Sequence, residues 1–479
     1  MQRVQRVRIV PPPGVEQFDG LHEAPAQVGR AIFDGRRYGA LHVPAQQSAR
    51  LQIAQRLGQH LLRYARQAAV QHTRARGAAM TGGQRVEHHA GPLGREQLQH
   101  AAGRAILAPF LIGRSRLHVV TSWCLAMTKT ALVVGASGIV GSATAALLVE
   151  QGWTVHGLAR RPSRQAGVEP VAADLLDARA TAAALRGIDP DAVFITTWLR
   201  QDSEAENIRV NAAMVRNLLD GLAKPTGPRH VALVTGLKHY LGPFEAYGQG
   251  TLPQTPFREE QGRLDVENFY YAQEDEVFAA AVRDGFTRSV HRPHTVIGLA
   301  VGNAMNMGTT LAVYATLCRE TGRPFTFPGS AAQWSGLTDM TDARQLARHL
   351  IWAADTEAAH DEAFNVVNGD VFRWQWMWHR IADWFGIAAA PFDGIVRPLE
   401  RQMADDAALW RAIATREGLA EPDLSRLASP WHTDADLGRP IEVVTDMSKS
   451  RRLGFTGYQP TDDAFFALFE RLRADRLIP

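Results

Sequence analysis

The feature that most constrains the fold is a glycine-rich segment within residues 129–161. It begins with an apolar stretch at residues 131–134, which is typical of a buried β-strand. Glycines follow at positions 135, 138 and 141, and the amphipathic stretch after them is typical of a helix. A second apolar stretch then leads to two arginines. Strands that alternate with helices in this way predict an α/β fold with a parallel sheet.

The glycine-rich turn also predicts a ligand. Glycines at this spacing let the pyrophosphate of a dinucleotide approach backbone N–H groups at the start of the following helix. We therefore expect a cofactor at Gly135, Gly138 and Gly141. An acidic residue after the second strand would select NAD, but Arg160 and Arg161 stand there, and two guanidiniums are suited to the 2′-phosphate of NADP. The predicted cofactor is NADP(H). An ordinary tight turn and a solvated arginine loop are the alternative interpretations.

The first 126 residues differ from the rest of the chain. They contain 17 arginines, no lysine and 6 acidic residues, although the whole chain has a net charge of only +3. Their apolar residues show no sustained period, so we expect a disordered or upstream extension without assigned function, with Met127 as the working start. A targeting segment and a basic arm that binds nucleic acid are the alternatives. No zinc-ligand spacing or aromatic stacking motif supports the nucleic-acid alternative.

From residue 127 onward, predicted strands and helices alternate. We expect strands at residues 130–134, 154–159, 170–174, 192–197, 230–235 and 287–292. This pattern predicts a doubly wound Rossmann-type sheet over residues 127–300, with ligands beyond the carboxyl ends of its strands. Residues 301–479 contain tryptophan-rich helices, which predict a smaller, mostly helical substrate cap. Within that cap, residues 363–370 are expected to return to the main sheet.

Composition limits the location of the protein and its ligands. Two cysteines, Cys124 and Cys318, cannot form a disulfide framework and predict a reducing, cytoplasmic compartment. The chain lacks an uninterrupted run of about 18 apolar residues, so no membrane span is expected. His291 and His294 have no partners at metal-ligand spacing, so no metal is expected and core or loop roles are preferred.

The usual catalytic pair of short-chain dehydrogenases, Tyr-x-x-x-Lys on one helix, is missing. In that motif the lysine faces the same side of the helix as the tyrosine and favours the tyrosinate. Here Glu274 stands four residues after Tyr270, and Asp275 stands four residues after Tyr271. A carboxylate at that place would raise the pKa of the phenol. Either the protein is catalytically inactive or the lysine comes from elsewhere, and Lys238, after the fifth predicted strand, could meet Tyr270 across the cleft.

Several motifs together resemble one known family. They are Thr-Gly-Leu-Lys-His-Tyr-Leu-Gly-Pro-Phe-Glu at 235–245, Asn-Phe-Tyr-Tyr-Ala-Gln-Glu-Asp at 268–275 and Asn-Gly-Asp-Val-Phe-Arg-Trp at 368–374. With the Ala-Arg-Arg turn at 159–161, they closely resemble the progesterone 5β-reductase/iridoid synthase group of extended short-chain dehydrogenases. The resemblance runs from about residue 127 to residue 479. Family members use NADPH to reduce the carbon–carbon double bond of an enone or enal.

The resemblance implies roles for individual residues. Lys238 and Tyr270 would be catalytic, although Tyr271 could trade roles with Tyr270 if the helix rotates. Asp174 would face the adenine amino group, and Ile297 would meet the nicotinamide through its backbone. The implied cofactor contacts are Ser137, Gly138, Ile139, Arg160, Arg161, Asp174, Leu175, Thr197, Trp198 and Ile297. His239 and Tyr240 are equally compatible with a pocket wall and with packing.

The predicted activity is NADPH-dependent conjugate hydride addition to an enone or enal. Reduction of the carbonyl group itself, alcohol oxidation and NADP(H) sensing without turnover are the alternatives. The apolar, tryptophan-rich cap predicts a small hydrophobic substrate. A homodimer is left open, and neither nucleic acid nor a membrane is expected as a partner.

Overall fold

The computed structural model describes residues 128–479, apart from residues 225–226, 244–252 and 304. All described residues belong to one compact unit, Thr121–Pro479. The extension predicted over residues 1–126 therefore lies outside the described residues. The predicted boundary near residue 300 stays a prediction.

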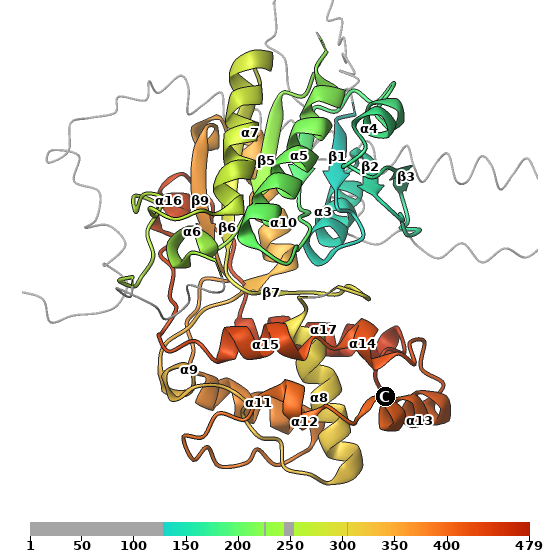
Figure 1. Cartoon of the computed structure of the whole chain (residues 1–479), viewed down its shortest axis with the longest axis vertical. Helices are drawn as coiled ribbons and strands as arrows, with labels where there is room; N and C mark the ends of the chain where they lie inside the picture. Colours follow the sequence, from blue (N-terminus) through green and yellow to red (C-terminus); the bar gives the residue numbers. More distant parts are fainter. Residues whose placement is uncertain (1–127, 225–226, 244–252, 304) are drawn as a thin grey trace, which may run out of the picture. The chain divides into compact units, whose positions relative to one another are not determined.

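Within the described part of the chain, seven parallel strands form one sheet in the order β3-β2-β1-β4-β5-β6-β9 (Figure 1). Their bounds are β1 Thr130–Val134, β2 Thr154–Ala159, β3 Val168–Ala172, β4 Ala192–Ile195, β5 His230–Val234, β6 Thr287–Pro293 and β9 Glu362–Val366. The order of strands reverses between β1 and β4, and in such sheets ligands bind beyond the carboxyl ends of the strands at that point. The predicted Rossmann-type sheet is confirmed.

The third strand lies two residues earlier than predicted. β3 pairs with β2 so that Val168 lies opposite Val155 and Ala172 lies opposite Ala159. The predicted strand began at Pro170, whereas Pro170 lies in the middle of β3. Because β3 is at the edge of the sheet, the N–H group that proline lacks is not needed for pairing with a second neighbouring strand. The segment predicted to return to the sheet does so, because β9 pairs with β6.

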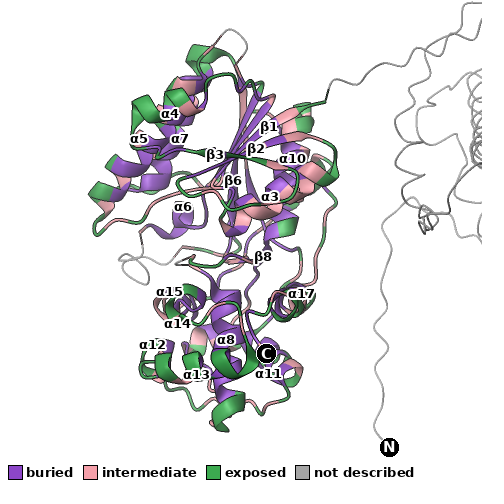
Figure 2. Ribbon diagram, turned by 90° about the vertical axis from the view of Figure 1, so that its right-hand side faces the viewer, coloured by how far each residue is buried: buried purple, intermediate pink, exposed green. Residues whose placement is uncertain are grey.

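Helices cover both faces of the sheet (Figure 2). Because side chains alternate along a strand, Ala131 and Val133 of β1 pack on one face and Leu132 and Val134 on the other. The first face is covered by α3 (Ile139–Glu150) and α10 (Ala343–Asp355), and the second by α5 (Glu204–Leu222) and α7 (Phe269–Asp284). Shorter elements complete this layer: α4 Ala178–Ala184, α6 Lys238–Leu241, the 3₁₀ turn Glu357–Ala359 and α16 Ser448–Arg452.

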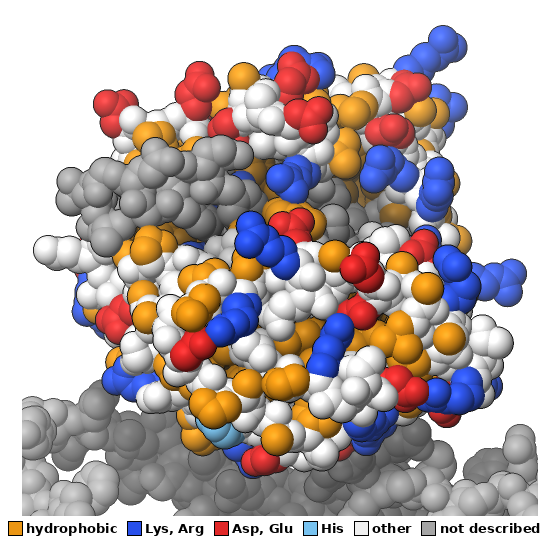
Figure 3. Space-filling model, turned by 60° about the horizontal axis from the view of Figure 1, so that its bottom comes forward, with side chains coloured by type: hydrophobic (Ala, Val, Ile, Leu, Met, Phe, Trp, Pro, Cys, Tyr) orange, Lys and Arg blue, Asp and Glu red, His pale blue; other side chains and the backbone are white. Residues whose placement is uncertain are grey.

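A second core fills the helical cap. Trp374, Trp378 and Trp410 are fully buried there, so these aromatic residues pack inside the cap. The cap helices are α8 Met307–Thr321, α9 Ala331–Ser335, α11 Trp374–Phe385, α12 Leu399–Gln402, α13 Ala407–Glu417, α14 Leu424–Leu427, α15 Pro430–Leu437 and α17 Thr461–Ala474. A small sheet of β7 (Val296–Ile297) and β8 (Thr341–Asp342) links the two layers of the molecule. On the face drawn in Figure 3, cationic, anionic and apolar side chains are interspersed. None of the described helices is long and apolar enough to span a bilayer.

Candidate active site

The glycine-rich turn joins β1 to α3 at the switch point of the sheet. Gly135 has a φ of +88°, a conformation that favours glycine. A Cβ atom on Gly141 would lie 2.2 Å from the carbonyl oxygen of Gly135, so the first turn of α3 can pack on the strand only without a side chain there. Gly138 precedes α3, and no side-chain hydrogen bond caps this helix end. The backbone of the turn can therefore approach a ligand closely.

A cavity of about 300 Å³ begins at this turn and runs along the carboxyl ends of β1, β4, β5 and β6. Eight of the predicted site residues line it: Gly135, Ser137, Gly138, Ile139, Thr197, Trp198, Lys238 and Tyr270. The two candidate catalytic residues are thus brought to one cavity, although 32 positions separate them in the sequence. Gly236 also lines it, and a Cβ atom there would lie 3.2 Å from the hydroxyl oxygen of Tyr270. Glycine therefore leaves room beside the phenol.

The other predicted cofactor residues lie outside the lining of this cavity. Arg160 and Arg161 are exposed directly after β2, and Asp174 is exposed after β3. Leu175 and Ile297 are buried. All of these residues follow strand ends or belong to β7, so their placement is compatible with the periphery of a long ligand, and their roles stay predictions.

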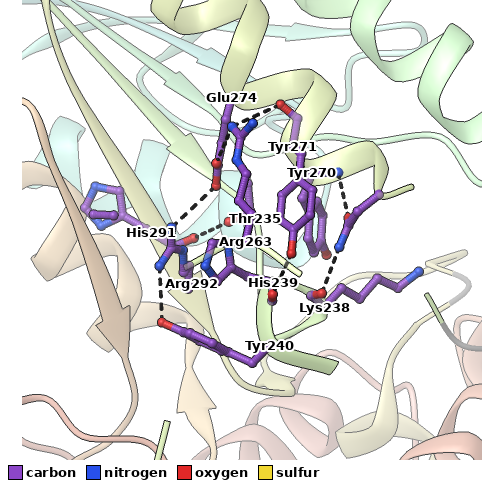
Figure 4. A network of polar contacts seen from close by, with 12 residues as sticks. Thr235, Lys238, His239, Tyr240, Arg263, Tyr270, Tyr271, Glu274, His291 and Arg292 are labelled. Atoms are coloured by element: carbon purple, nitrogen blue, oxygen red, sulfur yellow. Dashed lines mark hydrogen bonds and ion pairs between the residues drawn. The ribbon is translucent and has the colours of Figure 1, made fainter. Parts of the chain in front are cut away.

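Lys238 is the first residue of α6, directly after the loop that leaves β5. Lys238 is only 6% exposed. The ammonium nitrogen lies 5.0 Å from the ring centroid of Phe269 and 5.5 Å from that of Trp198, so two aromatic faces stabilise the cation. In Figure 4 the side chain extends away from the rings of Tyr270 and Tyr271. This orientation indicates that the ammonium interacts with a ligand in the cavity and not with the hydroxyl of Tyr270.

Tyr270 and Tyr271 occupy different environments on α7. The hydroxyl of Tyr271 donates to the carbonyl oxygen of His239 at 2.7 Å and accepts from the N–H of Leu264 at 3.0 Å. Burial raises the pKa of Tyr271, and the nearby carboxylate of Glu274 adds to this. Tyr270 instead lines the cavity. The tertiary structure therefore favours Tyr270 as the residue that meets a ligand.

One side chain connects the two elements that hold the candidate pair. Asn268 precedes α7, and its Oδ1 accepts a hydrogen bond from the backbone N–H of Tyr270 at 3.0 Å, which caps the helix. Its Nδ2 donates to the carbonyl oxygen of Lys238 at 2.8 Å. Asn268 thus fixes the start of α7 against the start of α6, a link that the sequence did not reveal.

Glu274, which replaces the usual lysine, is held by two arginines (Figure 4). Its side chain is 3% exposed, lies 2.9 Å from Arg263 Nη2 and lies 3.8 Å from Arg292 Nη2. Arg292 Nη1 donates to the hydroxyl of Tyr240 at 3.2 Å, and that hydroxyl donates to Asn365 at 2.7 Å. The carboxylate is therefore part of a buried structural network behind the tyrosines.

His239 and Tyr240, left open by the sequence, have packing roles. The ring of Tyr240 stacks on Phe257 with centroids 5.0 Å apart. His239 Nε2 lies 3.2 Å from the carbonyl oxygen of Gln261, and burial lowers the pKa of this imidazole to about 4. Neither residue lines the cavity. Both instead support the segments that carry Lys238 and Tyr271.

The cap side of the cavity is polar, which differs from the expectation of an apolar pocket. Five residues, named here the polar wall, line it: His294, Thr295, His432, Asp436 and Arg439. Arg439 Nη1 donates to His294 Nε2 at 2.8 Å, and His294 Nδ1 lies 2.9 Å from Asp339 Oδ1. Within the described ranges, no group of three or more His, Cys, Asp or Glu side chains is arranged to hold a metal ion.

Sequence reasoning missed the polar wall and Asn268. His294 follows β6, so its position beyond a strand end was the available signal. His432, Asp436 and Arg439 lie on and after α15, where no motif marked them. Asn303 and Met305, from the segment before α8, also line the cavity.

Comparisons with known proteins show the family of the chain. The model of the NAD dependent epimerase/dehydratase family matches residues 131–366. An (S)-8-oxocitronellyl enol synthase from Camptotheca acuminata is 36% identical over 365 residues, which cover 73% of this chain and 93% of the relative. A 3-oxo-Δ(4,5)-steroid 5-β-reductase from Arabidopsis thaliana is 36% identical over 366 residues, with the same shares covered.

Solved structures support the fold. The Bordetella bronchiseptica enzyme WbmH, solved in complex with NAD+, is similar with a TM-score of 0.51 at 17% identity. The match covers 72% of this chain and 99% of that one. At this identity the likeness shows a shared fold and nothing further.

Proposed function

Because the chain belongs to the progesterone 5β-reductase/iridoid synthase family of extended short-chain dehydrogenases and is an oxidoreductase with a nicotinamide cofactor, we propose that it reduces the carbon–carbon double bond of enones and enals with NADPH. One observation carries the proposal: Lys238 and Tyr270, from different helices, line a single cavity that also reaches the glycine-rich turn. The adenosine part of the cofactor would lie outside this cavity, toward the exposed residues Arg160, Arg161 and Asp174.

The turn between β1 and α3 fits the pyrophosphate of the cofactor. Gly141 lets the first turn of α3 pack closely on the carbonyl oxygen of Gly135, and Gly138 places no side chain directly before the helix. We propose that the backbone of Ser137, Gly138 and Ile139 holds the pyrophosphate, where the partial positive charge of the helix N-terminus favours an anion. Thr197, Trp198 and Ile297 would then lie along the rest of the cofactor.

The reaction needs stabilisation of a developing oxyanion. Bound NADPH supplies the hydride that adds to the β-carbon of the substrate. The electron pair of the carbon–carbon double bond then forms a double bond between the α-carbon and the carbonyl carbon, while the π pair of the carbonyl group moves to its oxygen. The hydroxyl of Tyr270 donates a hydrogen bond to this enolate oxygen. The ammonium of Lys238 keeps this part of the cavity electropositive and would hold the nicotinamide ribose. Water delivers the proton to the α-carbon, so no further acid is required.

A panel of enones and enals tests the proposal. The full chain is incubated with NADPH and 2-cyclohexenone, methyl vinyl ketone, progesterone or citral, while NADPH absorbance is followed and products are identified by mass spectrometry. We expect saturated ketones or aldehydes. An allylic alcohol would instead identify a carbonyl reductase. Tight NADPH binding without oxidation by any substrate would identify a regulatory protein.

The preference for NADPH has its own test. Arg160 and Arg161 are exposed and free to reach a 2′-phosphate after β2. The double variant Arg160→Ser/Arg161→Ser should raise KM for NADPH at least about tenfold and leave KM for NADH nearly unchanged. Arg164→Ser, in the same exposed loop, is the matched control. Equal effects on both cofactors would contradict the assignment.

The cytoplasmic location and the homodimer also stay predictions.

A further inference from the structure

Asp436 is an ionised carboxylate with spare acceptor capacity at the cavity. It is 3% exposed, and it accepts hydrogen bonds from the guanidinium of Arg439 and the hydroxyl of Thr295. Burial opposes its ionised form, but Arg439 outweighs this and holds the pKa of Asp436 below its usual range. A carboxylate offers about four acceptor positions. The two protein donors therefore leave room for a further donor from the cavity.

The guanidinium of Arg439 contacts both Asp436 and His294, and the other ring nitrogen of His294 contacts Asp339. Because His294 Nε2 accepts from Arg439, its Nδ1 carries the proton toward Asp339, an assignment that follows from the hydrogen-bond network. Asp339 also accepts from the N–H and the hydroxyl of Thr445, both at 2.6 Å. This network holds the guanidinium of Arg439 in place and thereby orients Asp436.

His432 is the neighbour of Asp436 on the cavity wall. Its Nε2 lies 3.9 Å from Asp436 Oδ2, which is too long for a hydrogen bond. Its Nδ1 is buried and has no hydrogen-bond partner among the described residues. Burial lowers the pKa of His432, although Asp436 works in the opposite direction, so the imidazole is neutral. The nearby carboxylate of Asp436 favours the tautomer of His432 that carries its proton on Nε2. The donor Nε2–H and the acceptor Oδ2 then lie side by side on the cavity wall.

The 3.9 Å between Nε2 of His432 and Oδ2 of Asp436 allows one oxygen atom in the cavity to form a hydrogen bond with both groups. An oxygen about 2.8 Å from both Nε2 of His432 and Oδ2 of Asp436 would make two hydrogen bonds at roughly a right angle. It must accept from the imidazole and donate to the carboxylate. A ketone or ether oxygen cannot donate, a carboxylate would be repelled by Asp436, and an ammonium cannot accept from the imidazole. A hydroxyl group satisfies both.

We propose that the substrate is an enone or enal that carries a hydroxyl group, bound between His432 and Asp436. This inference rests on the proposed reductase function. His432 and Asp436 are then specificity-determining residues, and the polar wall selects hydroxylated substrates over hydrocarbon-only ones. A water molecule could bridge the same two groups, and the experiment distinguishes the two.

The test compares three matched series of 2-enals with six, eight and ten carbons. One series carries a terminal hydroxyl, the second a terminal methoxy group, and the third no substituent. At one chain length, we expect kcat/KM for the hydroxyl compound to exceed kcat/KM for both matched compounds at least about tenfold. Only the hydroxyl compound can donate a hydrogen bond to the charged Asp436. Equal kcat/KM across the three series at every length would overturn the proposal.

Variants connect the selectivity to the wall. Asp436→Asn and His432→Phe should each reduce the hydroxyl-to-methoxy ratio of kcat/KM to below about 3. This ratio, measured on one preparation, does not depend on the folded fraction, and two variants are used in case one fails to fold. Met305→Leu changes the shape of the same cavity but no polar group, so it should keep the ratio. A ratio that survives in both polar variants would contradict the assignment.

A binding measurement separates this inference from the proposed reaction. Saturated ω-hydroxy, ω-methoxy and unsubstituted methyl ketones of the same lengths are titrated by calorimetry into the full chain with NADP+. Tighter binding of the hydroxy ketone supports the hydroxyl site even if no enal is reduced, in which case only the proposed reaction fails. Reduction of enals without any hydroxyl preference in binding or turnover leaves the reaction intact and overturns the hydroxyl site.

Discussion

The hydroxyl of Tyr271 donates a hydrogen bond to the backbone carbonyl oxygen of His239, and the backbone N–H of Leu264 donates to the same hydroxyl. The hydroxyl of Tyr271 therefore stabilises the fold and does not face a ligand. Tyr270, one residue earlier, lines the cavity and lies beside Gly236. The position of α7 in the fold, which the local sequence does not fix, thus distinguishes two adjacent tyrosines.

We predict opposite phenotypes for the two phenylalanine variants. Tyr270→Phe should lower kcat/KM for an enone at least about 100-fold, because a donor to the developing oxyanion is lost. Tyr271→Phe should keep most of the activity but lower the free energy of unfolding by about 1–3 kcal/mol, because two backbone groups lose a buried partner. Steady-state kinetics and urea denaturation measure the two effects. Full turnover by Tyr270→Phe would rule out its proposed role.

A second prediction concerns the link between α6 and α7. Asn268→Asp keeps an oxygen to cap α7 but loses the N–H donated to the carbonyl oxygen of Lys238. We expect kcat to fall about tenfold, through misplacement of the candidate pair. Asn306→Asp is the matched control, because Asn306 caps α8 and donates to the carbonyl oxygen of Ala300 in the same way.

Stability measurements make the comparison decisive. Both asparagine variants should lose similar stability, about 1–2 kcal/mol, because each loses one buried hydrogen bond. Only Asn268→Asp should lower kcat. If both variants lower kcat to the same extent, Asn268 has no special positioning role.

The third prediction is that restoring the usual motif spacing does not restore a usual site. Glu274→Lys would place a third cation beside Arg263 and Arg292 in a buried network. We expect a loss of about 3–5 kcal/mol in the free energy of unfolding. The control is Asp275→Lys, whose carboxylate also pairs with Arg263 but is 62% exposed. It should cost no more than about 1 kcal/mol. Comparable losses in the two variants would contradict a structural role for Glu274.

The fourth prediction rests on a chain of buried histidines that runs from the main sheet to helix α10. His230 Nε2 lies 2.8 Å from the hydroxyl oxygen of Ser289, which lies 2.8 Å from His291 Nε2. The Nδ1 atoms of His291 and His349 are 3.0 Å apart, and His349 Nε2 lies 2.9 Å from the hydroxyl of Ser450. Burial lowers the pKa of His230 to about 3, helped by nearby His360, and lowers the pKa of His349 to about 3. Burial also holds the pKa of His291 well below its usual value.

These lowered pKa values make the protein less stable in acid. In the unfolded chain each imidazole takes up a proton as the pH falls through 6.5, whereas the folded imidazoles stay neutral until about pH 3. The free energy of unfolding should therefore be constant above pH 7 and fall between pH 6.5 and 3. At pH 5 the loss is about 2 kcal/mol each for His230 and His349. Urea denaturation at pH 8, 6 and 5 measures it, and a flat profile would contradict the prediction.

The sequence was sufficient for features that depend on local pattern. The apolar run at β1, the glycine-rich turn and the alternation of strands and helices predicted the sheet, because each is determined within a few residues. Lys238 and Tyr270 were singled out because their motifs are local, and both line the cavity, while their catalytic roles stay predictions. Pro170 misled the assignment of β3, since nothing local shows that a strand lies at the edge of a sheet.

The remainder of the site depends on contacts between distant segments. Arg439 and His294 are 145 residues apart, and neither carries a motif that names its partner. The tryptophans of the cap suggested an apolar pocket. Trp374 and Trp378 are instead buried inside the cap, and the cap residues that line the cavity include the charged Asp436 and Arg439. Composition reports which side chains a segment contains, and only packing decides which of them face a ligand.

The polar wall has its two halves on either side of β9 in the chain. His294 and Thr295 come before that strand, and His432, Asp436 and Arg439 come after it. Lys238, Tyr270 and the glycine-rich turn all precede it as well. Recombination with a relative at a junction just beyond β9 would therefore separate His294 and Thr295 from their hydrogen-bond partners Arg439 and Asp436, so a functional chimera needs parents whose two halves of the wall match.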